Sequence, residues 1–259
     1  MRMAQLHVDK ELNEDVGNSV NYSGQSLTDE EFSKFKIGDN LDSEQRDSIR
    51  KLLGHFYGAF GWKDEDFHTS ICDPVTKIPY KARVELTDDT PVNLSAYQYS
   101  SKLRLIIREH IDRLIRRKMI EPASSQWCSP LCLVPKGEKE FRPVFDYRKL
   151  NKQCKFIPCP MPSLHDALNK FKGRKYFCNL DMADSFQQVE LEELSRDILA
   201  FICQEGTFRP LRVPFGWLHS GTVFQKFMNL IFSLINSQCL SNYIDDNGFS
   251  AENFKIMCD

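Results

Sequence analysis

Two adjacent carboxylates at the end of a predicted strand constrain this chain more than any other stretch. Tyr243 and Ile244 favour a strand, and the Asp245-Asp246-Asn247-Gly248 run that follows favours a tight turn. We therefore expect a short strand that delivers Asp245 and Asp246 at the tip of a hairpin. Like charges side by side repel, so the pair is costly unless a cation binds there, and oxygen ligands suit Mg²⁺. Taken alone, however, an Asp-Asp pair is more typical of a solvated turn.

A third carboxylate gives the pair its meaning. The run Phe177-Cys178-Asn179-Leu180 ends in Asp181, which predicts a second strand with an acidic end. Aspartates on two neighbouring strands could clamp two metal ions roughly 4 Å apart, the arrangement used for in-line phosphoryl transfer. We therefore predict a metal site formed by Asp181, Asp245 and Asp246.

The composition excludes several other classes of protein. The 41% hydrophobic and 27% charged content is ordinary for a soluble globular chain, and 259 residues suffice for one large domain or two small ones. No apolar run reaches membrane-spanning length, and the N-terminus lacks the apolar core of a secretory signal. The nine cysteines are scattered without a Cys-x-x-Cys pair, so neither a disulfide framework nor a zinc site is indicated. We expect reduced thiols and an intracellular location, cytoplasmic or nuclear, rather than secretion.

Charge is distributed unevenly along the chain. The net charge is −2, but residues 101–175 hold 18 Lys and Arg against 7 Asp and Glu, a net of +11 that leaves −13 for the rest. A basic middle between acidic ends is typical of a surface that binds a polyanion such as nucleic acid. The alternative is a set of solvated faces without a partner.

The sequence divides into three parts. Residues 1–40 are polar and acidic, which predicts a linker or disordered lead. Residues 41–100 predict an amphipathic helix near 41–61 and an extended arm near 75–95. Residues 101–259 then form the main domain, beginning with a helix that Pro122 stops. Four of its arginines could form a basic rim for nucleic acid or a solvated face: Arg108, Arg113, Arg116 and Arg117.

A charged hairpin is predicted between residues 130 and 147. Two apolar runs flank a turn that contains Gly137, with Lys136 at the tip and Arg142 on the return strand. These cations could grip a triphosphate, Arg as a planar fork and Lys as a point charge. A surface hairpin protected by charge is the alternative. Two strands around Gly206 and a helix over 222–235 with a core-facing apolar stripe complete the pattern.

The order of these motifs resembles the fingers and palm of a reverse transcriptase, most closely that of gypsy-type long-terminal-repeat retrotransposons and their Pol polyproteins. The resemblance covers roughly residues 45 to 250 and is strong because the motifs occur together in this order. The segments that carry it are Ile120-Glu121-Pro122-Ala123-Ser124-Ser125-Gln126-Trp127-Cys128-Ser129-Pro130, Leu133-Val134-Pro135-Lys136, Phe141 to Asn151, Leu180-Asp181-Met182-Ala183, Pro214-Phe215-Gly216, Phe224-Gln225 and Tyr243-Ile244-Asp245-Asp246.

The resemblance implies RNA- and DNA-templated DNA synthesis on a template-primer, with deoxynucleoside triphosphates as substrates. Asp181 and Asp245, with Asp246 beside them, would hold two Mg²⁺ ions, or Mn²⁺ in their place. It also implies an α/β fold with an antiparallel palm sheet, helices on one face of that sheet, and a mixed fingers subdomain. No membrane partner is implied.

The resemblance assigns further site residues by position. Phe186 matches the aromatic gate under the sugar, whose ring would collide with a 2′-hydroxyl; taken alone it is more typical of a core aromatic. The other matches are Lys136 and Arg142 with the triphosphate, Phe215 and Gly216 with the pocket floor, and Gln225 and Tyr243 with positions near the template and primer.

The chain departs from the family pattern in three places. Asp184-Ser185 precedes Phe186 where the family has small residues, so we expect a further acidic group near the metals. The run Trp217 to Val223 differs from the usual pocket sequence, which puts the pocket's shape in doubt. Asn247-Gly248 replaces an apolar strand after Asp246, so we expect a weak return strand. The expected thumb and ribonuclease H are missing after this hairpin.

These departures leave two other functions open. The chain is either a polymerase or a truncated or decayed element copy that retains only nucleic-acid binding. An RNA-templated RNA polymerase also carries paired aspartates, but Phe186 and the Phe141 to Asn151 block speak against it.

Overall fold

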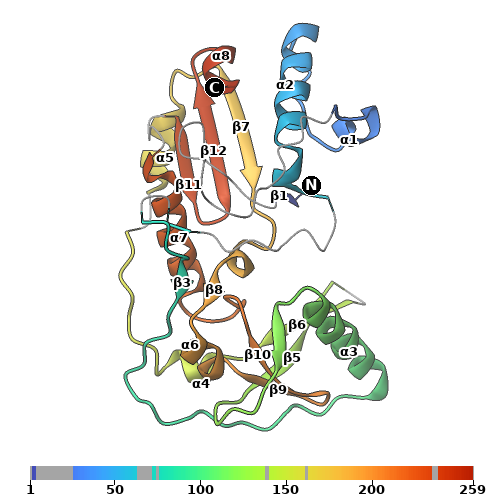
Figure 1. Cartoon of the computed structure of the whole chain (residues 1–259), viewed down its shortest axis with the longest axis vertical. Coiled ribbons are helices and arrows are strands. Elements are labelled where there is room, and N and C mark those ends of the chain that lie inside the picture. Colours follow the sequence, from blue (N-terminus) through green and yellow to red (C-terminus); the bar gives the residue numbers. More distant parts are fainter. Residues whose placement is uncertain are drawn as a thin grey trace. The chain divides into compact units, whose positions relative to one another are not determined.

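The computed structural model describes residues 2–3, 26–62, 72–73, 76–137, 140–160, 163–234 and 239–258. They form two compact units, each built from separate stretches of chain. The first unit comprises residues 1–69, 161–183 and 228–259, and the second comprises residues 70–160 and 184–227. The elements of both units are labelled in Figure 1.

The first unit is built on a three-stranded antiparallel sheet. Its order is β11 (Leu240–Tyr243), β12 (Asp246–Ala251) and β7 (Tyr176–Asp181). Exposure alternates strictly along β7, with Phe177, Asn179 and Asp181 exposed and the residues between them half-buried. This period of two is the signature of a strand with one solvent-facing side. A short second pairing joins β1 (Arg2–Met3) to β2 (Phe60–Gly61).

Helices contact both faces of this sheet. Tyr176 contacts Phe254 of α8 (Phe254–Cys258), and Gln45 of α2 (Ser43–His55) donates to the Tyr176 hydroxyl. On the opposite face, Phe171 of α5 (Leu164–Phe171) packs against Phe177 with ring centroids 6.0 Å apart. The end of α5 therefore also contacts the face of the sheet that carries Phe177.

The return strand β12 contradicts the expected weak hairpin, since it is the central strand of the sheet. Asn247 is fully buried, and both ends of its side-chain amide have hydrogen-bond partners. The amide donates to the backbone oxygens of Leu180 and Asp245 and accepts from Asn242. The ring of Phe171 packs closely against Gly248, since its Cζ lies only 2.8 Å from the position that a Cβ on Gly248 would take. Residues with poor strand propensity are thus accommodated because each has a specific three-dimensional partner.

The predicted lead over residues 1–40 is described only in part, because residues 4–25 lie outside the described ranges. Residues Asp29–Ser33 form a short helix, α1, whose N-cap Thr28 and Glu31 make a reciprocal capping box. Tyr57 of the 3₁₀ turn η1 (Tyr57–Ala59) donates its hydroxyl to Glu31. This part of the lead is therefore folded onto the first unit.

The second unit is built on a five-stranded mixed sheet. Its order is β4 (Ile120–Pro122), β10 (Gly206–Pro210), β9 (Phe201–Cys203), β5 (Ser129–Lys136) and β6 (Glu140–Phe145). Only the β5–β9 pair is parallel within this sheet. The predicted charged hairpin is the β5–β6 pair, and the strands around Gly206 are β9 and β10. Fully buried aromatic rings, among them Tyr147 and Phe201, form the core of this unit.

The arm expected near residues 75–95 is extended but is a strand only at β3 (Lys81–Ala82), which pairs in parallel with β8 (Glu190–Leu191). Isolated bridges, Leu86 to Cys154 and Asn93 to Cys128, secure the rest. The remaining elements of the described part are α3 (Ser101–Arg116), α4 (Arg148–Asn151), η2 (Ser185–Gln188), α6 (Glu193–Ile198), α7 (Ser220–Ile231) and η3 (Phe232–Leu234). None of the helices in the described ranges is long and apolar enough to cross a membrane.

Candidate active site

The predicted hairpin tip is present at the end of the first unit's sheet. Tyr243 of β11 pairs with Asp246 of β12, which leaves Ile244 and Asp245 as a two-residue turn. Ile244 has a φ of 54°, and Asp245 is not among the described residues with positive φ. A positive φ at the first turn residue alone is the pattern of a type II′ turn, where glycine is the usual occupant. A β-branched residue in this region stores strain of about 1–3 kcal/mol.

Hydrogen bonds hold the strained turn in place. The Asn242 side chain donates to the Ile244 carbonyl at 3.1 Å, and the Met182 amide donates to the Asp245 carbonyl at 3.3 Å. The second bond joins the tip directly to the residue after Asp181. The turn and the end of β7 are therefore fixed as one piece of backbone.

The three predicted metal ligands come from this one edge of the sheet. Asp181 is the direct cross-strand partner of Asp246, and both residues are exposed, whereas Asp245 is half-buried in the turn. Directly opposed residues of an antiparallel pair project from the same face, with Cβ atoms about 4.5–5.5 Å apart. The carboxylate that faces Asp181 is thus that of Asp246, and Asp245 is the neighbour at the turn.

The donor chemistry of this edge fits a divalent cation. Carboxylate oxygens are the ligands that Mg²⁺ and Mn²⁺ prefer, and two opposed like charges are unfavourable without a cation. Within the described ranges, no three His, Cys, Asp or Glu side chains are close enough together to form a metal site as they stand. The sheet therefore brings the ligands to one edge without assembling a complete coordination shell.

A cavity of about 500 Å³ opens on the same face of the sheet. Asp246 and Tyr243 line it next to the hairpin turn, and the rest of its lining is mostly aromatic or small: Phe171, Phe177, Cys178, Asn179, Ser241, Gly248 and Phe249. Tyr243, predicted near the template and primer, is half exposed there.

The predicted nucleotide-binding residues belong to the second unit, and three of them form a continuous row. The Arg142 guanidinium lies over the Phe215 ring at 5.5 Å, and the Phe215 and Phe186 ring centroids are 5.1 Å apart. Arg142 is exposed and both phenylalanines are half-buried, so the row has an open side. Lys136 is exposed at the end of β5, opposite Glu140, and its contacts within the described residues do not join it to this row.

The loop predicted to form the pocket floor is fixed by Gly216 and Asn151. Gly216 has a φ of 97°, and a Cβ there would lie 2.8 Å from the Phe145 carbonyl oxygen. The Asn151 amide donates to the Gly216 carbonyl at 3.0 Å and accepts from the Leu218 amide at 2.9 Å. The unusual sequence after Gly216 therefore keeps a well-determined loop. By contrast, Gln225, predicted near the template, has no exposed surface and occupies a core position of α7.

Asp184, expected as a further acidic group near the metals, forms an ion pair with Arg117. Its carboxylate accepts a hydrogen bond from Arg117 Nη2 at 2.7 Å, and Arg117 is only 5% exposed. Arg117, predicted on a basic rim, thus faces inward. The departure from the family pattern at Asp184 marked this residue in the sequence. Its partner Arg117 lies 67 residues away, and no local sequence pattern connects the two residues.

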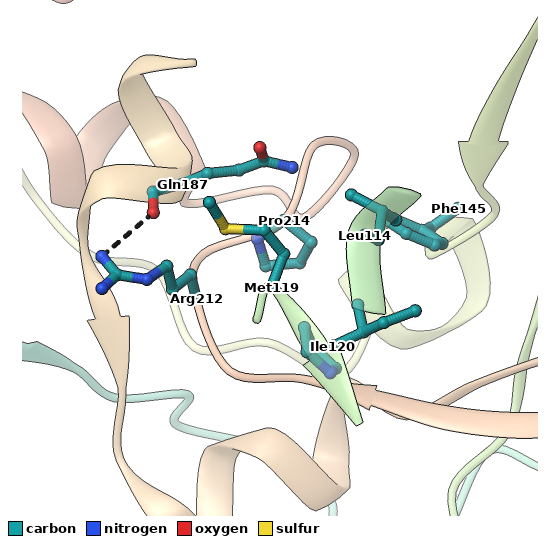
Figure 2. A pocket seen from close by; sticks show the side chains of 8 residues that line it. Leu114, Met119, Ile120, Phe145, Gln187, Arg212 and Pro214 are labelled. Atoms are coloured by element: carbon teal, nitrogen blue, oxygen red, sulfur yellow. Dashed lines mark hydrogen bonds between the residues drawn. The ribbon is translucent and has the colours of Figure 1, made fainter. Parts of the chain in front are cut away.

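Two other functional candidates escaped the sequence analysis. Arg212 donates to the backbone carbonyls of Gln187 and Gln188 at 3.3 and 3.0 Å, and Figure 2 shows the first of these bonds beside a small apolar cavity. His110 lies in α3 within reach of the hairpin's charge. Burial, followed by the charges of Arg113 and Arg142, lowers the pKa of His110 to about 4.

Comparison with known proteins settles the family. The family model described as "Reverse transcriptase (RNA-dependent DNA polymerase)" matches residues 134–255, which include Arg142, Phe186 and all three aspartates. This chain carries a reverse transcriptase domain. The domain is similar to the retrovirus-related Pol polyprotein from transposon 412 of Drosophila melanogaster, with 38% identity over 173 residues, 64% of this chain and 14% of the relative. The polyprotein from transposon 297 of the same fly is 29% identical over 86% of the chain and 21% of the relative.

Solved structures agree on the fold of this reverse transcriptase domain. The foamy viral protease-reverse transcriptase in complex with dsDNA has a TM-score of 0.71 at 24% identity, covering 90% of this chain and 47% of that one. The complex of the same protein with an RNA/DNA hybrid has a TM-score of 0.69 at 24% identity, covering 85% and 29%. The described part of the chain therefore has the palm and fingers fold. It spans 14–21% of the length of the first curated relatives that it matches.

Proposed function

We propose that the chain contributes the catalytic and nucleotide-binding parts of an RNA-directed DNA polymerase of the retrotransposon type. The primary support is the register that sets Asp181 opposite Asp246 beside a hydrogen-bonded Asp245 turn. The relatives' descriptions as Pol polyproteins and the nucleic acids bound by the structural neighbours support the same function. The partners would be an RNA or DNA template-primer and a deoxynucleoside triphosphate.

In the proposed reaction, the primer 3′-oxygen attacks the α-phosphorus of the triphosphate. A new phosphodiester bond forms, the bond to the β-phosphate oxygen breaks, pyrophosphate leaves, and the hydroxyl proton passes to solvent. Asp181, Asp245 and Asp246 would hold two Mg²⁺ or Mn²⁺ ions, which supply charge neutralisation and a more acidic 3′-hydroxyl when bound. Catalysis of this kind depends on positioning and electrostatics rather than on covalent chemistry with the protein.

The row of Arg142, Phe215 and Phe186 would receive the nucleotide. The Arg142 guanidinium offers a planar fork to phosphate oxygens, and Lys136 offers a second positive charge on the same hairpin. Phe186 would lie under the sugar, and Phe215 with Gly216 would form the floor. Gln225 and Tyr243 would act near the template and primer, Gln225 from its buried position by supporting the residues around it.

Primer extension tests the proposal. The wild-type chain should incorporate deoxynucleotides with Mg²⁺ on an RNA template, and Asp181→Asn or Asp246→Asn should reduce the rate at least about 100-fold. Asp47→Asn is the matched control, since Asp47 is an exposed aspartate of α2 in the same unit. Equal incorporation by wild type and Asp246→Asn would refute the proposed function.

A further inference from the structure

The turn that carries Phe186 begins with an unusual backbone conformation. Asp184, the residue before η2, has φ 44° and ψ 43°, in the left-handed region. Short polar residues tolerate this region better than others, but the conformation persists only when its surroundings hold it. Two backbone bonds close the turn, from the Gln187 amide to the Asp184 carbonyl at 2.8 Å and from the Val189 amide to the Phe186 carbonyl at 3.1 Å.

Arg117 holds this turn from the end of α3. Its Nη2 lies 2.7 Å from the Asp184 carboxylate, with 5% of the Arg117 side chain and 22% of the Asp184 side chain exposed. The Arg117 amide itself bonds to the Arg113 carbonyl, so the guanidinium extends from a fixed point on the helix. A charge pair so shielded from water is screened weakly, and removing one partner leaves the other charge poorly solvated.

Arg212 holds the other end of the same turn. Its Nη1 donates to the carbonyls of Gln187 and Gln188, and its Nη2 lies 3.8 Å from Glu190. In Figure 2, Arg212 and Gln187 lie beside Met119 and Pro214 at the cavity of about 10 Å³. Two arginines thus hold the segment of residues 184–188 that presents Phe186, Arg117 through a side chain and Arg212 through the backbone.

The ring of Phe186 has little freedom between these anchors. It packs against Phe215 at 5.1 Å and against Phe224 at 5.9 Å between ring centroids. A steric gate works only if its ring stands within a fraction of an ångström of the excluded hydroxyl, because a displacement of about 1 Å can change a rate 100-fold.

We infer that Arg117, acting through Asp184, is a positioning residue for the Phe186 gate and thereby sets the selection of deoxyribose over ribose. This inference rests on the proposed function, because it assigns a specificity role within the same nucleotide pocket. It also gives the family departure at Asp184 a reason: the acidic side chain binds Arg117, the residue that caps the C-terminus of α3, and the pair holds the turn in one conformation.

Kinetic discrimination provides the first test. Arg117→Ala and Asp184→Asn should each lower the ratio of kcat/KM for a deoxynucleotide to that for the matching ribonucleotide about tenfold, mostly by raising kcat/KM for the ribonucleotide, whose 2′-hydroxyl a displaced ring no longer excludes. The double variant should lose no more than the larger single loss, since both changes remove one interaction. The control is Arg83→Ala, which removes an exposed arginine 3.9 Å from Glu192 in the same unit. An unchanged ratio in both single variants would overturn the inference.

Hydrogen–deuterium exchange provides a test that needs no activity. In Arg117→Ala, the amides of Gln187 and Val189 should exchange about tenfold faster than in wild type, whereas Arg83→Ala should leave them unchanged. Asp184→Asn, which keeps the size of the side chain, serves if Arg117→Ala does not fold. If wild type extends no primer, the proposed function fails, and the exchange rates still decide whether the pair holds the turn. Rates equal to those of the control would overturn the inference.

Discussion

Asp181 and Asp246 lie directly opposite each other on neighbouring antiparallel strands, at the edge of the sheet that carries the hairpin tip. This register does not stabilise the sheet, because directly opposed like charges weaken the pairing of two strands. Asp246 nevertheless stays opposite Asp181 because other residues of the same strand, β12, are held by specific contacts. These residues are Asn247, Gly248 and Ser250. Ser250, for example, is fully buried and donates to the Lys170 carbonyl of α5.

The opposed carboxylates predict a conflict between stability and metal binding. Without divalent ions, Asp246→Asn should raise the free energy of unfolding by about 0.2–1 kcal/mol, because it removes a repulsive cross-strand pair. With Mg²⁺ at millimolar concentration, the wild type should gain more stability than the variant, because a cation that binds the folded state stabilises it. Urea unfolding in EDTA and in Mg²⁺ measures both effects, with Asp47→Asn as control. A variant that is less stable than wild type in EDTA would contradict this prediction.

The buried amide of Asn247 predicts a large and local cost of substitution. Asn247→Leu keeps the approximate size but leaves the carbonyls of Leu180 and Asp245 without their donor, which should cost about 3 kcal/mol of unfolding free energy. Asn179→Leu, on the exposed side of β7, should change stability by about 0.5 kcal/mol or less. Chemical denaturation of both variants distinguishes them. Equal losses would show that the hydrogen bonds of Asn247 contribute little.

Alanine substitutions at two glycines with positive φ would distinguish the cost of backbone strain from the cost of steric overlap. Gly137 has a φ of 72° with nothing within 4 Å of an added Cβ, so Gly137→Ala should cost about 1 kcal/mol from the backbone alone. Gly216→Ala adds an overlap with the Phe145 carbonyl oxygen at 2.8 Å, which should cost a further 1–3 kcal/mol, approximately. Thermal unfolding compares the pair. Losses of the same size would mean that the Phe145 carbonyl moves aside freely.

His110 predicts a loss of stability in mild acid. Its folded-state pKa of about 4 lies below the ordinary value of 6.5, so the folded protein favours the neutral imidazole and the unfolded chain binds the extra proton. The contribution is fully present above pH 6.5, and it falls by about 1–3 kcal/mol as the pH drops from 6.5 to 4. Subtracting the stability of His110→Gln from that of wild type at each pH isolates this histidine. A difference that does not change over that interval would contradict the assigned pKa.

Local patterns predicted the elements of this fold better than the way they pair. The hairpin at Tyr243–Asp246 follows from strand formers beside turn formers, and the charged hairpin around Gly137 follows from the same rule. The neighbouring position of the Asp181 strand was expected from chemistry and from the family resemblance, because strand pairing between distant segments leaves no local trace in a single sequence. Which aspartate faces Asp181 depends on register, and register is visible only in the assembled sheet.

The wrong expectations have one physical origin. Asn247 and Arg117 are polar residues that propensity assigns to turns or surfaces, yet both are buried, because each has a partner from another part of the chain. Propensity averages over environments, and a buried hydrogen bond or ion pair overrides it. Gln225, assigned by resemblance to the template side, also has no exposed surface, and its role there stays a prediction.

The isoleucine at the hairpin tip has a consequence for how tightly the acidic edge is controlled. A glycine at position 244 would adopt the positive φ of this turn without strain, but it would also allow many other conformations of the turn. Ile244 allows few backbone conformations. Because the hydrogen bonds from Asn242 and Met182 stabilise the strained conformation, the backbone at Asp245 has few alternatives. The strained turn therefore restricts movement of the Asp245 backbone relative to Asp181 and Asp246, the other two proposed metal ligands.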